Sequence, residues 1–408
     1  MKQHNLAVVK TLTYAMFAMF AMTTDSVGLI IPEIVKTFRL TLTAAGTFQY
    51  ATMAGIALAG LCLGTLADRL GRRRTIVIGL CAFAAASFLF AVGNAFLFFV
   101  VLMGLSGLAI GVFKTGALAL VGDISTSTTE HTSIMNTVEG FFSVGSIVGP
   151  AVLAYLLAHS VSWQWLYVIA GTMCVGLIVM ALSVTYPAMT TSGTASRART
   201  GTMDAIKSPY VLAFSVGVFL YVGVEAAIYV WMPTLLAGYR GRATWLAAYG
   251  ISIFFALRAA GRFVGAWMLL RWKWQTAVAI LSGGILACFA LSAAGGVDWA
   301  VYLLPASGLF MAVIYPTLNS KGISCVPKDE HGAAAGVILF FTCLSAVTAP
   351  LAMGALSDAT GQIAYGFWLA TGLAGLLFVG LLVNWLANPT GAVLAQLDVT
   401  DYSQETSV

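Results

Sequence analysis

Residues 64–74 read Gly64-Thr-Leu-Ala-Asp68-Arg-Leu-Gly71-Arg-Arg-Arg74 and separate two long apolar blocks. A glycine at position 64 lets one helix approach another closely, and Asp68 can accept hydrogen bonds from a helix N-terminus or an arginine. The arginine cluster is costly in hydrocarbon and is typical of a cytoplasmic loop. The stretch therefore predicts a short basic loop that joins two membrane-spanning helices.

The composition leads to the same class of protein. Of the 408 residues, 60% are hydrophobic and 9% are charged, with a mean hydropathy of +0.93, whereas a soluble chain carries about a quarter charged residues. This excludes a secreted disulfide scaffold, a nucleic-acid-binding protein and a disordered chain. The six cysteines have no CxxC spacing, so we expect small apolar side chains and neither a metal site nor a cofactor.

Apolar blocks of ~20 residues recur along the chain and predict an all-α integral membrane protein. Twelve transmembrane helices are expected, near residues 11–32, 46–67, 75–94, 97–121, 133–158, 164–186, 210–236, 244–270, 275–295, 299–320, 333–357 and 362–387.

Basic residues fix the expected orientation. Most lysines and arginines, including Lys10, Arg74 and Lys207, fall on the side of the N-terminus, so both termini are expected in the cytoplasm of a bacterial inner membrane. Four regions follow: an N-terminal six-helix bundle (1–186), a polar cytoplasmic linker (187–209), a C-terminal six-helix bundle (210–390) and a cytoplasmic tail (391–408).

The two halves resemble each other at a shift of about 200 residues. Glu130, His131, Phe141 and Pro150 are matched by Glu330, His331, Phe341 and Pro350, and Asp25 is matched by Glu225. Several matches near one shift indicate duplicated bundles related by pseudo-symmetry. Parallel repeats of this kind occur in secondary transporters, which place the substrate between the halves near the bilayer midplane.

The loop at 64–74 resembles the signature G-x-L-A-D-R-x-G-R-[RK] of the major facilitator superfamily, with every defining position present. The resemblance implies the major facilitator fold and no enzymatic activity. It also implies that the loop latches the cytoplasmic side, a gating role for Gly64, Asp68, Arg69, Gly71, Arg72 and Arg73. Arg262, in the corresponding loop region of the second half, is expected to join this interdomain charge pairing.

Four further stretches are similar to the fucose:proton symporter family: Tyr221-Val-Gly-Val-Glu225, Gly261-Arg-Phe-Val-Gly-Ala-Trp267, Tyr315-Pro-Thr317 and Ala349-Pro-Leu-Ala-Met-Gly-Ala-Leu-Ser-Asp358. That family moves monosaccharides inward with protons. The resemblance implies a proton-coupled importer of a monosaccharide or sugar derivative that works by alternating access, as a monomer in the lipid bilayer, with sugar and protons as its small-molecule partners.

Ionisable side chains inside the spans are the main functional candidates, because a charge at a helix centre costs about 2.5–3.5 kcal/mol on the insertion scale. Asp25 and Glu225 lie roughly 21–23 Å from the cytoplasmic ends of their spans, counted at the helical rise. Asp25 either carries the proton or fixes a kink before Pro32. Glu225 either handles proton or substrate, or pairs with Arg258 or Arg262.

Lys114 departs from the family pattern. The span 4 motif of the symporters ends in Glu-Thr-Ala, and Lys114 occupies the place of that acid here, which reverses the local charge. Lys114 and Glu139 both lie roughly 10 Å from the cytoplasmic ends of their spans and can form an ion pair for packing or gating. Alternatively, proton coupling falls to Asp25 with Glu139 or Glu225, and Lys114 binds a sugar acid.

Sugar binding needs polar side chains for hydroxyl groups and aromatic rings for the apolar ring face. The polar candidates are Gln49, Asn136, Tyr315 and Asn319, and the aromatic candidates are Phe141, Tyr229, Trp231 and Phe341, for which packing or lipid contact is the competing interpretation. The competing function is a proton-coupled exporter of drugs or metabolites, since Gly145-Ser-Ile-Val-Gly149-Pro150 partly resembles an antiporter motif.

Overall fold

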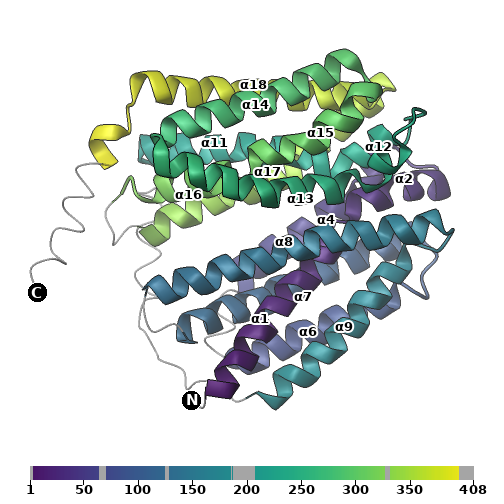
Figure 1. The fold of residues 1–408 in the computed structure, drawn as a ribbon. Helices are drawn as coiled ribbons and strands as arrows, with labels where there is room; N and C mark the ends of the chain where they lie inside the picture. Colours follow the sequence, from purple (N-terminus) through teal and green to yellow (C-terminus); the bar gives the residue numbers. More distant parts are fainter. Residues whose placement is uncertain are drawn as a thin grey trace, which may run out of the picture. The chain divides into compact units, whose positions relative to one another are not determined.

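The computed structural model describes residues 3–63, 70–124, 128–184, 186, 207–326 and 331–394, and this part of the chain is helical, without strands (Figure 1). The chain divides into two compact units, residues 1–191 with 247–255 and residues 192–246 with 256–408. The expected linker falls at the boundary, but residues 187–206 lie outside the described residues, as do residues 395–408 of the expected tail.

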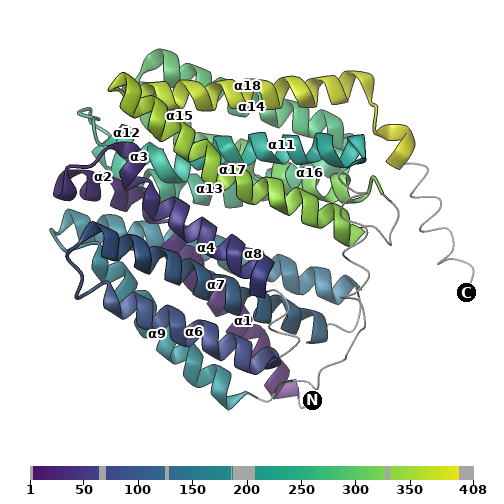
Figure 2. The same cartoon turned by 180° about the vertical axis from the view of Figure 1, so that it is seen from behind.

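The first unit is a bundle in which α1 packs on α8 and α9, α4 packs on α7, and α6 packs on α7 and α9 (Figures 1 and 2). Aromatic rings fill much of its interior. Its elements are α1 (Gln3–Thr24), α2 (Val27–Phe38), α3 (Leu42–Ala45), α4 (Thr47–Leu63), α6 (Arg72–Leu89), α7 (Phe96–Ile124), α8 (Thr128–Ala158) and α9 (Gln164–Ser183).

In the second unit, α11 packs on α16, α17 and α18, and α14 packs on α15 and α18. Residues 247–255 of α13 belong to the first unit, and the rest of that helix belongs to the second. The elements are α11 (Pro209–Ala226), the π-helical turn η1 (Ala227–Trp231), α12 (Met232–Leu236), α13 (Thr244–Arg271), α14 (Trp274–Gly295), α15 (Val297–Met311), α16 (Ile314–Ile323), α17 (His331–Thr360) and α18 (Ala364–Ala387).

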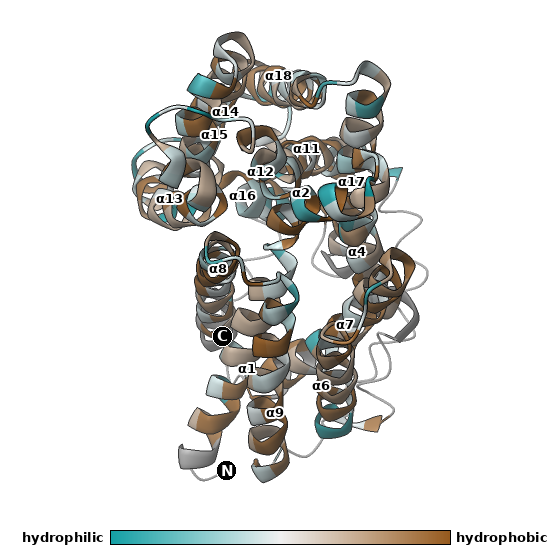
Figure 3. Ribbon diagram, turned by 90° about the vertical axis from the view of Figure 1, so that its right-hand side faces the viewer, coloured by the Kyte–Doolittle hydropathy of each residue, from teal (hydrophilic) through white to brown (hydrophobic). Residues whose placement is uncertain are grey.

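Among the described residues, ten segments are long and apolar enough to cross a membrane. The helices α4 and α6 occupy two further predicted spans, which completes the twelve. Apolar residues extend along most of the length of these helices (Figure 3). An all-α protein with twelve transmembrane helices is therefore confirmed.

Three spans depart from regular α-helix a few residues before a proline. The first span breaks at residues 25–26 ahead of Pro32, η1 precedes Pro233, and the tenth span breaks at 312–313 ahead of Pro316. Proline lacks the N–H that would bond to the carbonyl four residues earlier, and its ring crowds that carbonyl. This mechanism accounts for η1 and for the break at 312–313, whereas the carbonyl four residues before Pro32 is that of Gly28 within α2, so the break at 25–26 has another cause.

Candidate functional site

Asp25 lies in the break between α1 and α2, half-buried. The hydroxyls of its neighbours Thr23, Thr24 and Ser26 donate to main-chain carbonyls three or four residues earlier, at 2.9, 3.1 and 2.6 Å. Such back-bonding competes with the regular helical pattern and often bends a helix. The polar sequence at 23–26 therefore produces the bend that sets the Asp25 carboxylate within the bundle.

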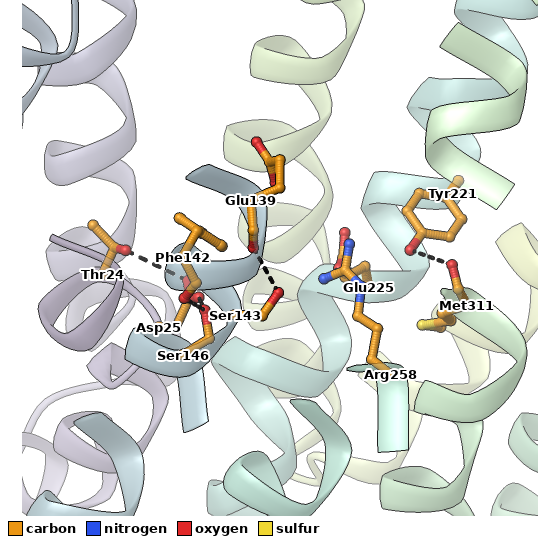
Figure 4. Close-up of polar contacts among 10 residues, drawn as sticks. All are labelled: Thr24, Asp25, Glu139, Phe142, Ser143, Ser146, Tyr221, Glu225, Arg258 and Met311. Atoms are coloured by element: carbon orange, nitrogen blue, oxygen red, sulfur yellow. Dashed lines mark hydrogen bonds and ion pairs between the residues drawn. The ribbon is translucent and has the colours of Figure 1, made fainter. Parts of the chain in front are cut away.

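The Asp25 carboxylate meets Ser146 of α8, as Figure 4 shows. Ser146 is fully buried and its hydroxyl donates to Asp25 Oδ2, while Thr24 Oγ1 lies 3.5 Å from Asp25 Oδ1. Ser146 Oγ also lies 3.1 Å from the Phe142 carbonyl, which it can use as an alternative acceptor. A hydroxyl with two available acceptors can stay bonded whether Asp25 carries a proton or not.

Two glycines of α8 bring Ser146 to Asp25. A Cβ added at Gly145 would overlap the backbone of Ala18 on α1, and one at Gly149 would overlap the backbone of Met22. Small residues four positions apart allow this backbone-to-backbone approach of membrane helices. The Gly145–Gly149 stretch, which partly resembles an antiporter motif, is thus the part of α8 against which α1 packs. Ser146 lies between these two glycines, and its place within the Gly145–Gly149 stretch is the sequence signal that could have identified it as a site residue.

Lys114 of α7 is half-buried, and its ammonium faces two aromatic rings of α1. Lys114 Nζ lies 5.4 Å from the centroid of Phe20 and 5.9 Å from that of Phe17. Contacts of this length stabilise a cation by roughly 0.5–2 kcal/mol. Glu139 is exposed on α8, and its carbonyl accepts from Ser143 at 2.9 Å. The predicted Lys114–Glu139 pair stays a prediction.

Glu225 is a buried acidic residue of the second unit. It lies at the end of α11, directly before η1, with 8% of its surface exposed, and it forms an ion pair with Arg258 of α13 (Figure 4). Arg262, one turn further along α13, lies close enough to interact with the Glu225 charge. The structure thus shows the pairing with Arg258 that was one of the two interpretations of Glu225.

Gln49 is a polar candidate in an unusual environment. It is fully buried on α4, and neither its Oε1 nor its Nε2 has a hydrogen-bond partner within the described part of the chain. A buried polar group without a partner costs about 1–3 kcal/mol. A substrate hydroxyl or a water molecule would satisfy it. Asn136 lies on α8, but its side chain is outside the described residues.

Tyr315 and Asn319 are both half-buried on α16. The Tyr315 ring packs against Tyr221 of α11 with the centroids 6.1 Å apart, and the Tyr221 hydroxyl donates to the Met311 carbonyl at 3.0 Å (Figure 4). That carbonyl lies just before the break at 312–313, so Tyr221 supports the irregular turn. In the sequence, Tyr221 stands out only as the first residue of the Tyr221–Glu225 stretch, and its contact with Met311 was not predicted.

The aromatic candidates lie in different environments. Trp231 is 2% exposed and its Nε1 donates to the Pro350 carbonyl of α17 at 3.0 Å, an arrangement that favours packing over contact with a sugar ring. Tyr229 is half-buried in η1. The Phe141 ring stacks on the ring of Tyr14 of α1, with the centroids 5.1 Å apart.

Phe341 of α17 is half-buried and packs against a small buried cluster of Val211, Val326, Ala334 and Val337. Phe341 also meets Phe340 edge to face, with the ring centroids 5.8 Å apart. These contacts again favour packing.

The signature loop is described only in part, since Gly64, Asp68 and Arg69 lie outside the described residues. Gly71 begins α6 with φ +85°, a conformation that favours glycine. Arg72 is half-buried, and Arg73 Nη2 donates to the Leu182 carbonyl at 2.6 Å. That carbonyl belongs to the last turn of α9, where a cation is favourable. Arg73 thus supports a helix end of its own bundle, and the gating role stays a prediction.

Comparison with known proteins agrees with this architecture. The family model of the Major Facilitator Superfamily matches residues 13–350. The L-fucose-proton symporter of Escherichia coli is 24% identical over 397 residues and covers 86% of each chain. A glucose/galactose transporter of Brucella abortus is 23% identical over 375 residues, 88% of this chain and 90% of its own length. The crystal structure of the nucleoside transporter NupG superposes with a TM-score of 0.75 at 14% identity, over 94% and 99% of the two chains.

A half-buried acid and a buried ion pair lie on interrupted helices in a chain of twelve spans. Together with its family and relatives, this arrangement defines a membrane transporter and not an enzyme. The chain belongs to the Major Facilitator Superfamily. It resembles the fucose:proton symporter within that superfamily, as the motifs of spans 7, 8, 10 and 11 predict.

Proposed function

We propose that the protein is a proton-coupled symporter that imports a monosaccharide or a close derivative across a bacterial inner membrane. Two relatives that align over most of the chain support this proposal by their names, one a fucose-proton symporter and the other a glucose/galactose transporter. We propose further that the protein acts as a monomer with both termini in the cytoplasm, because its basic residues gather on that side.

The contact of Asp25 with Ser146 carries the proposal. A carboxylate in a bend of a membrane helix, held by a hydroxyl from a second helix, is suited to take up a proton on one side and release it on the other. A fixed hydroxyl donor stabilises the ionised carboxylate without neutralising it permanently, unlike an arginine.

Uptake into proteoliposomes tests the proposal. Purified protein is assayed with a panel of labelled monosaccharides, with and without an inward proton gradient, and we expect accumulation of at least one sugar only under the gradient. Asp25→Asn should abolish accumulation while leaving sugar exchange measurable. The matched control is Asp298→Asn, since Asp298 is exposed in the first turn of α15. Accumulation of no monosaccharide, or full accumulation by Asp25→Asn, would contradict the proposal.

Lys114 supports a second candidate substrate class, the sugar acids. Its ammonium lies over the Phe17 and Phe20 rings, whose faces attract a cation. A charged ammonium there can attract a substrate carboxylate. A thermal-shift panel of neutral sugars against sugar acids, run on wild type and Lys114→Gln, distinguishes the two classes. Stabilisation by sugar acids that Lys114→Gln removes would favour this candidate, and stabilisation by neutral sugars alone would exclude it.

A further inference from the structure

An apolar groove of 370 Å³ lies on the second unit, away from every candidate residue named above. It is formed by residues 209–220 of α11, by Leu318 of α16 and by the last half of α18, and α11 packs on both of the other helices (Figure 2). Its lining is almost entirely apolar and includes Ala213, Gly217, Leu220, Leu318, Leu377 and Gly380. Glycine and alanine leave the groove open where larger side chains would close it.

Polar groups gather at one end of the groove. Asn384 and Thr390 line it there, and Thr390 Oγ1 donates to Asn384 Oδ1 at 3.3 Å. Asn384 Nδ2 is buried and has no hydrogen-bond partner within the described residues. Because a buried donor is nearly always satisfied, this amide points to a missing acceptor.

The start of α11 lies at the same end. Pro209 and Tyr210 line the groove, and Ser208 caps the helix by accepting from the Val211 N–H. The first N–H groups of an 18-residue helix carry a partial positive charge that attracts anions, phosphate above all. Lys207, which is exposed and directly precedes the cap, adds a full positive charge.

We propose that this groove is a binding site for one anionic phospholipid of the leaflet in which α11 begins. One acyl chain lies in the groove, and the phosphate accepts from Asn384 Nδ2 beside the start of α11. A phospholipid fits this shape because its chain is thin and apolar and its anionic group is fixed at one end.

Native mass spectrometry of the purified full chain tests the site, with phosphatidylglycerol, phosphatidylethanolamine and diacylglycerol titrated in turn. Gly380→Leu places a large side chain in the groove. A Cβ added at Gly380 meets nothing within 4 Å, so the substitution does not strain the helix. Gly372→Leu is the matched control, since Gly372 lies on the exposed surface of α18 outside the groove and is equally open. We expect Gly380→Leu to lose the tightest-bound phosphatidylglycerol and Gly372→Leu to retain it.

The head-group contact is tested separately. Asn384→Leu should weaken phosphatidylglycerol binding about tenfold, as the loss of a hydrogen bond to a charged group implies, and leave diacylglycerol binding unchanged. Thr390→Val removes the neighbouring hydroxyl but keeps Asn384 Nδ2, and should bind like wild type. Equal phosphatidylglycerol binding by Gly380→Leu and wild type would overturn the site. Equal affinity of wild type for diacylglycerol and phosphatidylglycerol would overturn the role given to the phosphate.

Discussion

Ser146 is a positioning residue for Asp25, because its hydroxyl is the buried donor that α8 supplies to the carboxylate. A hydrogen bond to a charged group contributes about 1.5–3 kcal/mol, so its loss changes how Asp25 holds its proton and its orientation. We predict that Ser146→Ala lowers proton-driven accumulation severalfold.

The control for this variant lies one turn away on the same helix. Ser143 is half-buried and donates to the Glu139 carbonyl of its own helix, so Ser143→Ala should accumulate substrate like wild type. Uptake into proteoliposomes at matched protein levels measures both. Equal losses in the two variants would show that any missing hydroxyl on α8 has this effect, and the role of Ser146 would be refuted.

Trp231 supports the fold of η1 through its bond to the Pro350 carbonyl. Trp231→Phe leaves that carbonyl without the indole donor and removes part of a fully packed ring, which we expect to cost about 1–3 kcal/mol of stability. The measurement is the apparent unfolding temperature in detergent. Trp245→Phe, at a residue 61% exposed, should leave it unchanged. An unaltered unfolding temperature together with weakened sugar binding in Trp231→Phe would restore Trp231 as a substrate contact.

At the scale of the helix, the approach of α1 to α8 depends on Gly145 and Gly149. Gly149→Ala would push its Cβ into the backbone of Met22, which cannot move aside as a flexible side chain does. Overpacking of this kind costs about 1–3 kcal/mol and would also displace Asp25 from Ser146. We therefore predict a lower unfolding temperature and lost accumulation for Gly149→Ala.

Gly140 provides the comparison on the same helix, because a Cβ there meets nothing within 4 Å. Gly140→Ala should be neutral or slightly stabilising, since alanine favours the helix. A Gly149→Ala protein that unfolds and transports like Gly140→Ala would show that the two helices can separate without consequence.

The helices themselves were predictable, and their irregular turns less so. Apolar blocks locate the spans within a few residues, because a bilayer demands ~20 apolar residues for each crossing. The prolines at 32, 233 and 316 mark where a span can break, but the sequence does not say whether the result is a bend, a π-helical turn or a new helix. That outcome depends on tertiary contacts such as the Tyr221 and Trp231 bonds to distant carbonyls.

Site residues were harder to predict than spans for a related reason. Ionisable residues in apolar blocks stand out by type alone, which makes Asp25, Lys114 and Glu225 candidates from the sequence. Ser146 was missed, because a serine between two glycines is ordinary in a membrane helix and acquires a role only when α1 lies against it. The aromatic candidates show the opposite problem, because aromatic residues are abundant in the sequence and most of them serve packing. The contacts of Trp231 and Phe341 that favour packing come from distant parts of the chain, which the sequence does not reveal.

At the scale of the whole molecule, the internal repeat places an acid in corresponding spans of the two halves but gives each a different partner. Asp25 accepts from a serine hydroxyl, whereas Glu225 pairs with the Arg258 guanidinium. The Ser146 hydroxyl can turn to the Phe142 carbonyl when Asp25 takes up a proton. Neutralising Glu225 instead removes this counter-ion from the buried Arg258 guanidinium, at a cost of about 3–5 kcal/mol. We infer that Asp25 is suited to handle a proton and that the Glu225–Arg258 pair is suited to support the structure.

Paired variants at these two positions test the separation. Glu225→Gln should lower the unfolding temperature strongly, and adding Arg258→Met should recover much of the loss, since the stranded charge is then gone. Asp25→Asn should unfold near the wild-type temperature while losing gradient-driven accumulation. If Glu225→Gln instead keeps its stability and loses accumulation as Asp25→Asn does, then both halves handle the proton, and the Arg258 pair must open during each transport cycle.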